Sequence, residues 1–186
     1  MRIVAGRFRG HSLAAPRGLR TRPTTDRLRE TIFNILVHGA DFSLDDTKVL
    51  DLFAGTGALG LEALSRGARF ALFIEEAAGA RAAIRDNIEA LGLTGATKLF
   101  RRDATRLGPM PPSAGGPFDL VFCDPPYGEG LAEPALVSAQ EGGWLQAGAI
   151  CVIEMGEADA LQLPPSFESP DTREYGETKL VFTAAR

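Results

Sequence analysis

The chain has 186 residues, 45% hydrophobic and 24% charged, as expected for one globular domain or one domain with a small extension. It contains no apolar run long enough to span a bilayer and no apolar signal core at its start, so we expect a cytoplasmic protein without membrane contact. Its two cysteines, Cys123 and Cys151, lie in apolar runs without metal-ligand spacing, which indicates buried free thiols and no metal site.

The net charge of −4 conceals a strong asymmetry along the chain. Residues 1–30 carry eight arginines against two acidic residues, whereas the remainder carries 12 basic and 22 acidic residues. The planar guanidinium fork suits phosphate contact better than an ammonium does. A basic end on an acidic body therefore favours polyanion binding at one place. The alternative is a solvated arm that only aids solubility.

The first 40 residues read as a small extension. Residues 2–13 alternate in part between apolar and basic types, with Gly6 and Gly10 as turn points, and this predicts a short β-hairpin. An arginine-rich loop follows. Thr24, Thr25 and Asp26 then predict a helix start with a threonine cap and an acid in the first turn. We expect residues 1–40 to form a basic, RNA-contacting extension and residues 41–186 to form the main domain.

From residue 48 onward, strands and helices alternate. Strands are expected at 49–52, 70–74, 97–100, 118–123 and 149–154, and helices at 58–65, 79–91 and 131–140. Residues 167–175 and 178–183, separated only by Gly176 and Glu177, predict a closing antiparallel hairpin. The pattern predicts an α/β fold with a Rossmann-like, seven-stranded, mostly parallel sheet.

A glycine-rich loop lies between the first strand and the first helix of this domain. Gly55, Gly57 and Gly60 satisfy the pattern G-x-G-x-x-G, and Glu75 follows at the distance of a ribose-binding acid. Nicotinamide enzymes share this pattern, so an oxidoreductase must be considered.

Three features favour S-adenosylmethionine as the ligand. Asp51 lies within reach of a cationic ammonium, Asp103 after the third strand is placed to accept from an adenine amino group, and the chain leaves little room for a dehydrogenase's second domain. Alternatively, Asp51 only orients the loop and Asp103 only caps a helix.

The stretch Asp124-Pro125-Pro126-Tyr127 follows the apolar strand 118–123. The prolines stiffen the chain and hold Asp124 in an extended conformation. A carboxylate, backbone carbonyls and an aromatic face together suit a planar group that carries an NH2, such as a nucleobase. The alternative is an ordinary turn at a strand end.

These motifs in this order resemble the RsmD family of class I S-adenosylmethionine-dependent methyltransferases, which methylate the N2 amino group of one guanine in 16S rRNA. The resemblance covers the N-terminal two thirds of the chain. Its most specific part is the Arg-Pro-Thr-Thr-Asp-Arg stretch at residues 22–27. The matching stretches are residues 2–6, Arg9-Gly10, 22–34, 51–65 and 124–127. One departure is Ala77, where the family often has a second acid after the counterpart of Glu75.

The resemblance implies roles for three groups of residues. The catalytic group is Asp124, Pro125 and Tyr127. The cofactor-binding group is Asp51, Phe53, Gly55, Gly57, Glu75, Asp103 and Ala104. The substrate-binding group is Arg7, Arg9, Arg22, Thr24, Thr25, Arg27 and Arg29.

The hypothesis at this point is methyl transfer to small-subunit rRNA, free or within an assembling 30S particle, with Tyr127 stacked on the target base. Two alternatives stay open besides the oxidoreductase. One is an amino methyltransferase that acts on adenine or cytosine in DNA. The other is a non-catalytic, RNA-binding ribosome-assembly factor.

Overall fold

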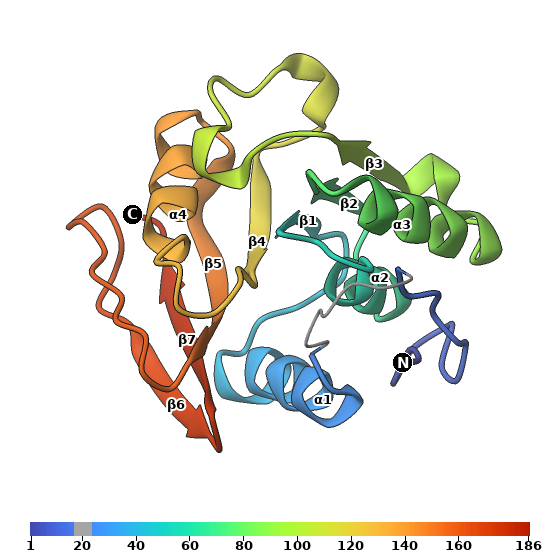
Figure 1. Cartoon of the computed structure of the whole chain (residues 1–186), viewed down its shortest axis with the longest axis horizontal. Coiled ribbons are helices and arrows are strands. Elements are labelled where there is room, and N and C mark those ends of the chain that lie inside the picture. The colour runs from blue at the N-terminus through green and yellow to red at the C-terminus, as the bar shows by residue number, and fades with distance from the viewer. Residues whose placement is uncertain (17–23) are drawn as a thin grey trace.

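The computed structural model describes residues 1–16 and 24–186 (Figure 1). The helices are α1 (Asp26–Asn34), α2 (Ala58–Ser65), α3 (Ala78–Ala90) and α4 (Ala132–Glu141), and a π-helical turn at Ile35–Gly39 continues α1. Short 3-10 turns occur at Thr94–Ala96, Ala104–Arg106 and Pro112–Ala114. The strands are β1 (Lys48–Leu52), β2 (Phe70–Ile74), β3 (Thr97–Phe100), β4 (Phe118–Cys123), β5 (Leu145–Gly156), β6 (Asp171–Tyr175) and β7 (Thr178–Ala184).

The seven strands form one sheet in the order β3-β2-β1-β4-β5-β7-β6. Strands β1 to β5 pair in parallel, and β7 is antiparallel to both of its neighbours, β5 and β6. The predicted Rossmann-like sheet with a C-terminal hairpin is confirmed. Strand β5 begins four residues earlier than expected, at Leu145, and a register shift accompanies its first pairing with β4.

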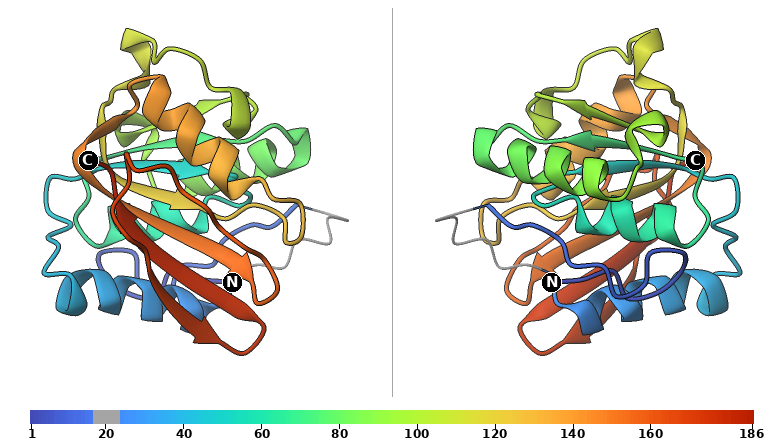
Figure 2. Two further views of the ribbon diagram at one scale, coloured as in Figure 1. Left: turned by 90° about the vertical axis from the view of Figure 1, so that its left-hand side faces the viewer. Right: turned by 90° about the vertical axis from the view of Figure 1, so that its right-hand side faces the viewer.

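Alternation along the strands divides the core into two layers. In β1, Val49 belongs to the layer under α1, α2 and α3, while Leu50 and Leu52 belong to the layer under α4. Figure 2 shows α1 and α2 on the side of the sheet opposite to α4. Asp51, two residues after Val49, therefore lies in the sheet on the side of α2.

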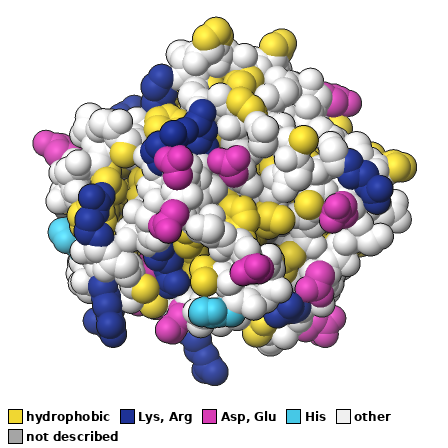
Figure 3. All heavy atoms as spheres, turned by 180° about the vertical axis from the view of Figure 1, so that it is seen from behind, with side chains coloured by type: hydrophobic (Ala, Val, Ile, Leu, Met, Phe, Trp, Pro, Cys, Tyr) yellow, Lys and Arg dark blue, Asp and Glu magenta, His cyan; other side chains and the backbone are white. Residues whose placement is uncertain are grey.

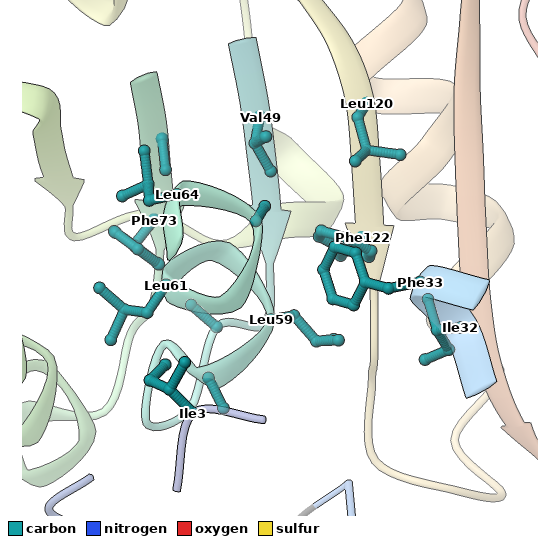
Figure 4. Packing of buried hydrophobic residues seen from close by; sticks show 14 of the residues in the cluster. Ile3, Ile32, Phe33, Val49, Leu59, Leu61, Leu64, Phe73, Leu120 and Phe122 are labelled. Atoms are coloured by element: carbon teal, nitrogen blue, oxygen red, sulfur yellow. The ribbon is translucent and has the colours of Figure 1, made fainter. Parts of the chain in front are cut away.

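Helix α1 is positioned by its cap and by one aromatic contact. Thr25 accepts a hydrogen bond from the Leu28 N–H at 3.1 Å, as the sequence predicted. On the inner face, Phe33 packs against Phe122 of β4 with ring centroids 5.6 Å apart, which places α1 over the end of the strand that precedes Asp124 (Figure 4).

The N-terminal segment forms the predicted short hairpin, with one antiparallel β-bridge between Arg2 and Ser12. The Ile3 N–H donates to the His11 carbonyl at 2.9 Å across it. The pairing goes no further because the backbone N–H groups of Val4 and Ala5 donate to the two carboxylate oxygens of Glu62 in α2, at 2.9 and 3.0 Å. The segment is thus bound to the main sheet domain through α2.

Candidate active site

The glycine loop and the Asp124 motif leave the sheet at the same edge. Strands β1 and β4 are parallel neighbours, with Leu52 opposite Cys123. The chain order reverses between these two strands, because β2 and β3 lie beyond β1 while β5 lies beyond β4. Ligands of open α/β sheets bind at such a reversal, outside the carboxyl ends of the strands.

The glycine loop is held in a tight turn. Gly55 and Gly57 have φ angles of +59° and +79°, and the non-glycine Phe53 also has a positive φ of +57°. A left-handed backbone at Phe53 is sterically costly, and such strained residues tend to cluster at functional sites. Gly60 is needed for space, since an added Cβ would lie 2.5 Å from Cε1 of Phe73.

Asp51 anchors the start of α2 beneath this loop. Its Oδ2 accepts a hydrogen bond from the Gly60 N–H at 3.0 Å, and its side chain is almost fully buried. Burial, helped by the nearby Glu75 charge and opposed by the Gly60 hydrogen bond, raises the pKa of Asp51 to about 8. A cationic ligand group at this position would offset the unfavourable burial of the carboxylate.

Glu75 closes the other side of the loop. Its Oε2 accepts from the Gly55 N–H at 2.8 Å, and its Oε1 accepts from the Ala77 N–H at 2.9 Å. The structure therefore brings Glu75 directly to the glycine turn. Its expected contact with ribose hydroxyls stays a prediction.

Asp103 caps the 3-10 turn Ala104–Arg106 at the end of β3. Its Oδ1 accepts from the Thr105 hydroxyl at 2.7 Å and from the Thr105 N–H at 2.9 Å, and these bonds lower the pKa of Asp103. Ala104 is buried beside it. The helix-cap alternative is what the structure shows, and an adenine contact by Asp103 stays a prediction.

Asp124 belongs to a pair of acidic side chains bridged by Thr24. The Thr24 hydroxyl lies 2.7 Å from Oε2 of Glu154 and 3.2 Å from Oδ2 of Asp124. A hydroxyl has a single hydrogen to donate. The two contacts are therefore both satisfied when one of the carboxyl groups carries a proton.

The electrostatics of the pair agree with this geometry. Burial, followed by the charge of Glu154, raises the pKa of Asp124 well above its usual range, and the Thr24 hydrogen bond opposes that rise only in part. Asp124 is half-buried, at the edge of the site.

Both the hydroxyl and the ring of Tyr127 are held in place by contacts. Its hydroxyl donates to Oε1 of Glu154 at 2.8 Å and lies 2.9 Å from the Thr178 hydroxyl. Its ring lies against the Gly156 backbone, since a Cβ added there would be 3.3 Å from Cδ2 of Tyr127. The ring is therefore preorganised, which suits a stacking surface.

Two acids of this site were missed from the sequence. Glu154, buried in β5, accepts from Thr24 and Tyr127. Asp159 accepts from the N–H groups of Gly128 and Gly156, at 3.1 and 3.0 Å, and so ties the loop after Tyr127 to the end of β5. An acid within the apolar run of residues 149–155 was the available signal for Glu154.

The predicted substrate-binding residues fall into distinct groups. Arg7, Arg9, Arg27 and Thr25 are exposed, Thr24 is buried against the acidic pair, and Arg22 lies outside the described residues. The expectation for Arg29 needs correction, because its side chain is fully buried. It pairs with Asp26 at 2.8 Å and Glu62 at 3.6 Å, so it is a structural cation of the extension.

The exposed basic residues do not form a single patch. Viewed from behind, Lys and Arg side chains are more frequent toward the left and lower edges, but others lie at the right edge and Asp and Glu side chains lie among them (Figure 3). Within the described part of the chain, no cluster of three or more His, Cys, Asp or Glu could hold a metal ion, and no helix is long and apolar enough to cross a membrane.

Comparison with known proteins agrees with the class of protein that the fold and site define, a Rossmann-like methyltransferase. The solved structure of yhhF from Escherichia coli superposes with a TM-score of 0.81 at 33% identity, covering 100% of this chain and 98% of that chain. A Haemophilus influenzae structure, HI0767, gives 0.76 at 26% identity, covering 100% and 98%.

The sequence comparisons specify the family. The family model described as Conserved hypothetical protein 95 matches residues 1–184. Ribosomal RNA small subunit methyltransferase D of Escherichia coli strain K12 is 36% identical over 166 residues, which cover 89% of this chain and 80% of that protein. The Haemophilus influenzae protein of the same name is 32% identical over 167 residues, covering 90% and 84%. The chain belongs to this family, the RsmD methyltransferases.

Proposed function

We propose that this protein transfers a methyl group from S-adenosylmethionine to the N2 amino group of a guanine in small-subunit (16S) rRNA. The observation that carries the proposal is the position of Asp124 and Pro125 at the end of β4, directly beside the glycine loop at the end of β1. The relatives named Ribosomal RNA small subunit methyltransferase D support the choice of rRNA.

The residues around the glycine loop fit the proposed cofactor. Asp51 would balance the ammonium of its methionyl part, Glu75 would hold the ribose hydroxyls, and Asp103 would accept from the adenine amino group. The walls of the cofactor site would be formed by Phe53, Gly55, Gly57 and Ala104. When bound, S-adenosylmethionine supplies an electrophilic methyl group on a sulfonium, so the protein needs only to orient the acceptor and take up its proton.

Asp124 and Pro125 would orient the acceptor. The carboxylate of Asp124 accepts one N–H of the base amino group and the carbonyl of Pro125 accepts the other, which turns the nitrogen lone pair toward the methyl group. Held in this way, the amino nitrogen would be in line with the methyl group that the bound cofactor would supply. The proton released by the nitrogen moves to Asp124, whose raised pKa suits a proton acceptor.

Exposed arginines of the extension, Arg7, Arg9 and Arg27, would contact RNA phosphates. The rigid ring of Tyr127 would stack on the target base after it leaves its helix or loop. Arg22 is proposed for the same phosphate-binding role from the sequence alone.

Substitution of Asp124 tests the proposal. Asp124→Ala should lose methyl transfer to small-subunit rRNA while calorimetry shows that cofactor affinity is kept, because Asp124 faces the acceptor. Methylation at the parent rate would contradict the role of Asp124. Failure of the parent protein to bind S-adenosylmethionine would favour a non-catalytic RNA-binding factor.

A further inference from the structure

A groove separates α1 from the turn between β6 and β7. Its volume is about 370 Å³, within the size range of sites for small ligands. Arg27, Leu28 and Thr31 line it from α1, Tyr175 and Thr178 line it from the hairpin, and Glu154 of β5 contributes to its lining. Figure 2 shows α1 and the hairpin side by side in both views.

The groove adjoins the active site, because residues that line it are hydrogen-bonded to active-site residues. Glu154 lines it and also accepts hydrogen bonds from Thr24 and Tyr127, the two residues that contact or follow Asp124. Thr178 lines it and lies 2.9 Å from the Tyr127 hydroxyl. An RNA strand that places a base at Asp124 would therefore place the neighbouring nucleotide in this groove.

The walls of the groove suit a nucleotide. Tyr175 is one of the few large apolar side chains that the described structure exposes, at 38% of its surface, and it stands at the hairpin end of the groove. Arg27 is exposed on the facing helix, and within the described residues it forms no ion pair with an acidic side chain. An aromatic face opposite a free guanidinium matches a base and its phosphate.

We propose that this groove binds the nucleotide adjacent to the methylated base, with Tyr175 stacked on its base and Arg27 on its phosphate. The inference rests on the proposed function, because it takes the substrate to be RNA. It adds a substrate-binding site, which would hold the flanking nucleotide while the target base is turned out of its stack.

The test measures binding of small-subunit rRNA and of S-adenosylmethionine separately. Tyr175→Ala should weaken RNA binding by about 5- to 150-fold, the range expected for loss of one base–aromatic stack, with cofactor affinity unchanged. Tyr175→Phe keeps the ring and should bind RNA as the parent does. Both variants alter an exposed residue at the end of β6, and their melting temperatures should match the parent's.

Arg27 is tested by the salt dependence of the same binding. Arg27→Ala should weaken RNA binding and lower the slope of log affinity against log salt by about 0.7 to 1, as expected when one phosphate contact is lost. Arg85→Ala, an exposed arginine on α3, is the matched control and should change neither quantity.

Unchanged RNA affinity in Tyr175→Ala would overturn the groove assignment, and so would equal losses in the Ala and Phe variants. The proposed function fails by a different result, namely a parent protein that binds cofactor but transfers no methyl group to the RNA. A groove that recognised a peptide instead would leave RNA binding unchanged in both the Tyr175 and the Arg27 variants.

Discussion

At the scale of single residues, the site is governed by acidic side chains that are buried, as Asp51 and Glu154 are, or half-buried, as Asp124 is. Asp124 and Glu154 share the hydroxyl of Thr24, and Asp51 lies under the glycine loop. Burial raises the pKa values of Asp124 and Asp51, so both carboxyl groups are poised to change charge when a ligand arrives. These raised pKa values lead to two predictions about pH.

The first prediction concerns Glu154→Gln. The charge of Glu154 raises the pKa of Asp124, and methyl transfer needs the charged form of Asp124, so activity falls as pH drops through that pKa. Removing the charge lowers the pKa, and the acid limb of the pH–rate profile should therefore move to lower pH. Single-turnover rates across the pH range check this, and an acid limb at the parent's position would contradict the coupling.

The second prediction concerns Asp51→Asn. The pKa of Asp51 is about 8 in the free protein, and a bound ammonium should lower it. Binding then releases a proton, so the parent's affinity for S-adenosylmethionine should rise between pH 6 and pH 8. The Asn variant has no carboxyl group at position 51, so any pH dependence that it keeps comes from the ligand itself. Its affinity should lack this rise. Equal pH dependence in both proteins would show that Asp51 does not face the ammonium.

At the scale of elements, the N-terminal extension is attached to the sheet domain by hydrogen bonds to three buried side chains, Glu62 and Ser65 of α2 and Asn87 of α3. Glu62 of α2 accepts from the backbone of Val4 and Ala5, pairs with Arg66 at 2.9 Å and lies 3.6 Å from the buried Arg29. Arg29 in turn pairs with Asp26 at the start of α1. The extension and α1 are thus fixed relative to α2, which carries the glycine loop at its start.

The third prediction concerns Glu62→Ala. The variant removes one of the two acidic partners of the buried Arg29 and leaves two backbone N–H groups without their acceptor, so the free energy of unfolding should fall by about 3–5 kcal/mol. Urea unfolding measures this. Glu89→Ala, an exposed acid on α3, is the control and should stay within about 0.5 kcal/mol of the parent. Equal stability of the two variants would refute the anchoring role of Glu62.

The elements themselves could be predicted from the sequence, because apolar strand runs and glycine stops are local signals. Strands β2, β3 and β4 and helix α2 have the predicted ends, and the others differ by a few residues. The N-terminal hairpin is limited to one bridge between Arg2 and Ser12, since the backbone N–H groups of Val4 and Ala5 bind Glu62. That contact joins residues 58 positions apart, which no local pattern reports.

At the scale of the whole molecule, the sheet order decides which distant residues meet. Insertion of β7 beside β5 brings Thr178 and Glu154 to Tyr127, and the docking of α1 brings Thr24 to Asp124. The sequence indicated Asp124 and the glycine loop through their motifs. It did not indicate Glu154 or the groove at Tyr175, because both depend on this long-range packing. Charge pattern also failed to separate the buried Arg29 from the exposed arginines.

The fourth prediction follows from the uneven charge of the molecule. The excess of arginine in residues 1–30 on an otherwise acidic chain should make RNA affinity fall steeply with salt, and Arg7→Ala combined with Arg9→Ala should reduce that slope. Filter binding at several salt concentrations measures it. A slope that is the same in the double variant would remove these two arginines from the RNA interface.

The central claim is that methyl transfer to an exocyclic amino nitrogen of guanine takes place where the carboxyl ends of β1 and β4 meet. Its most direct test is incubation of small-subunit rRNA, free and within particles, with isotope-labelled S-adenosylmethionine, followed by mapping of the labelled nucleoside. The parent protein should label N2 of one guanine and Asp124→Ala should label none. Label on adenine, on cytosine or on a ring carbon, or equal labelling by the variant, would contradict the claim.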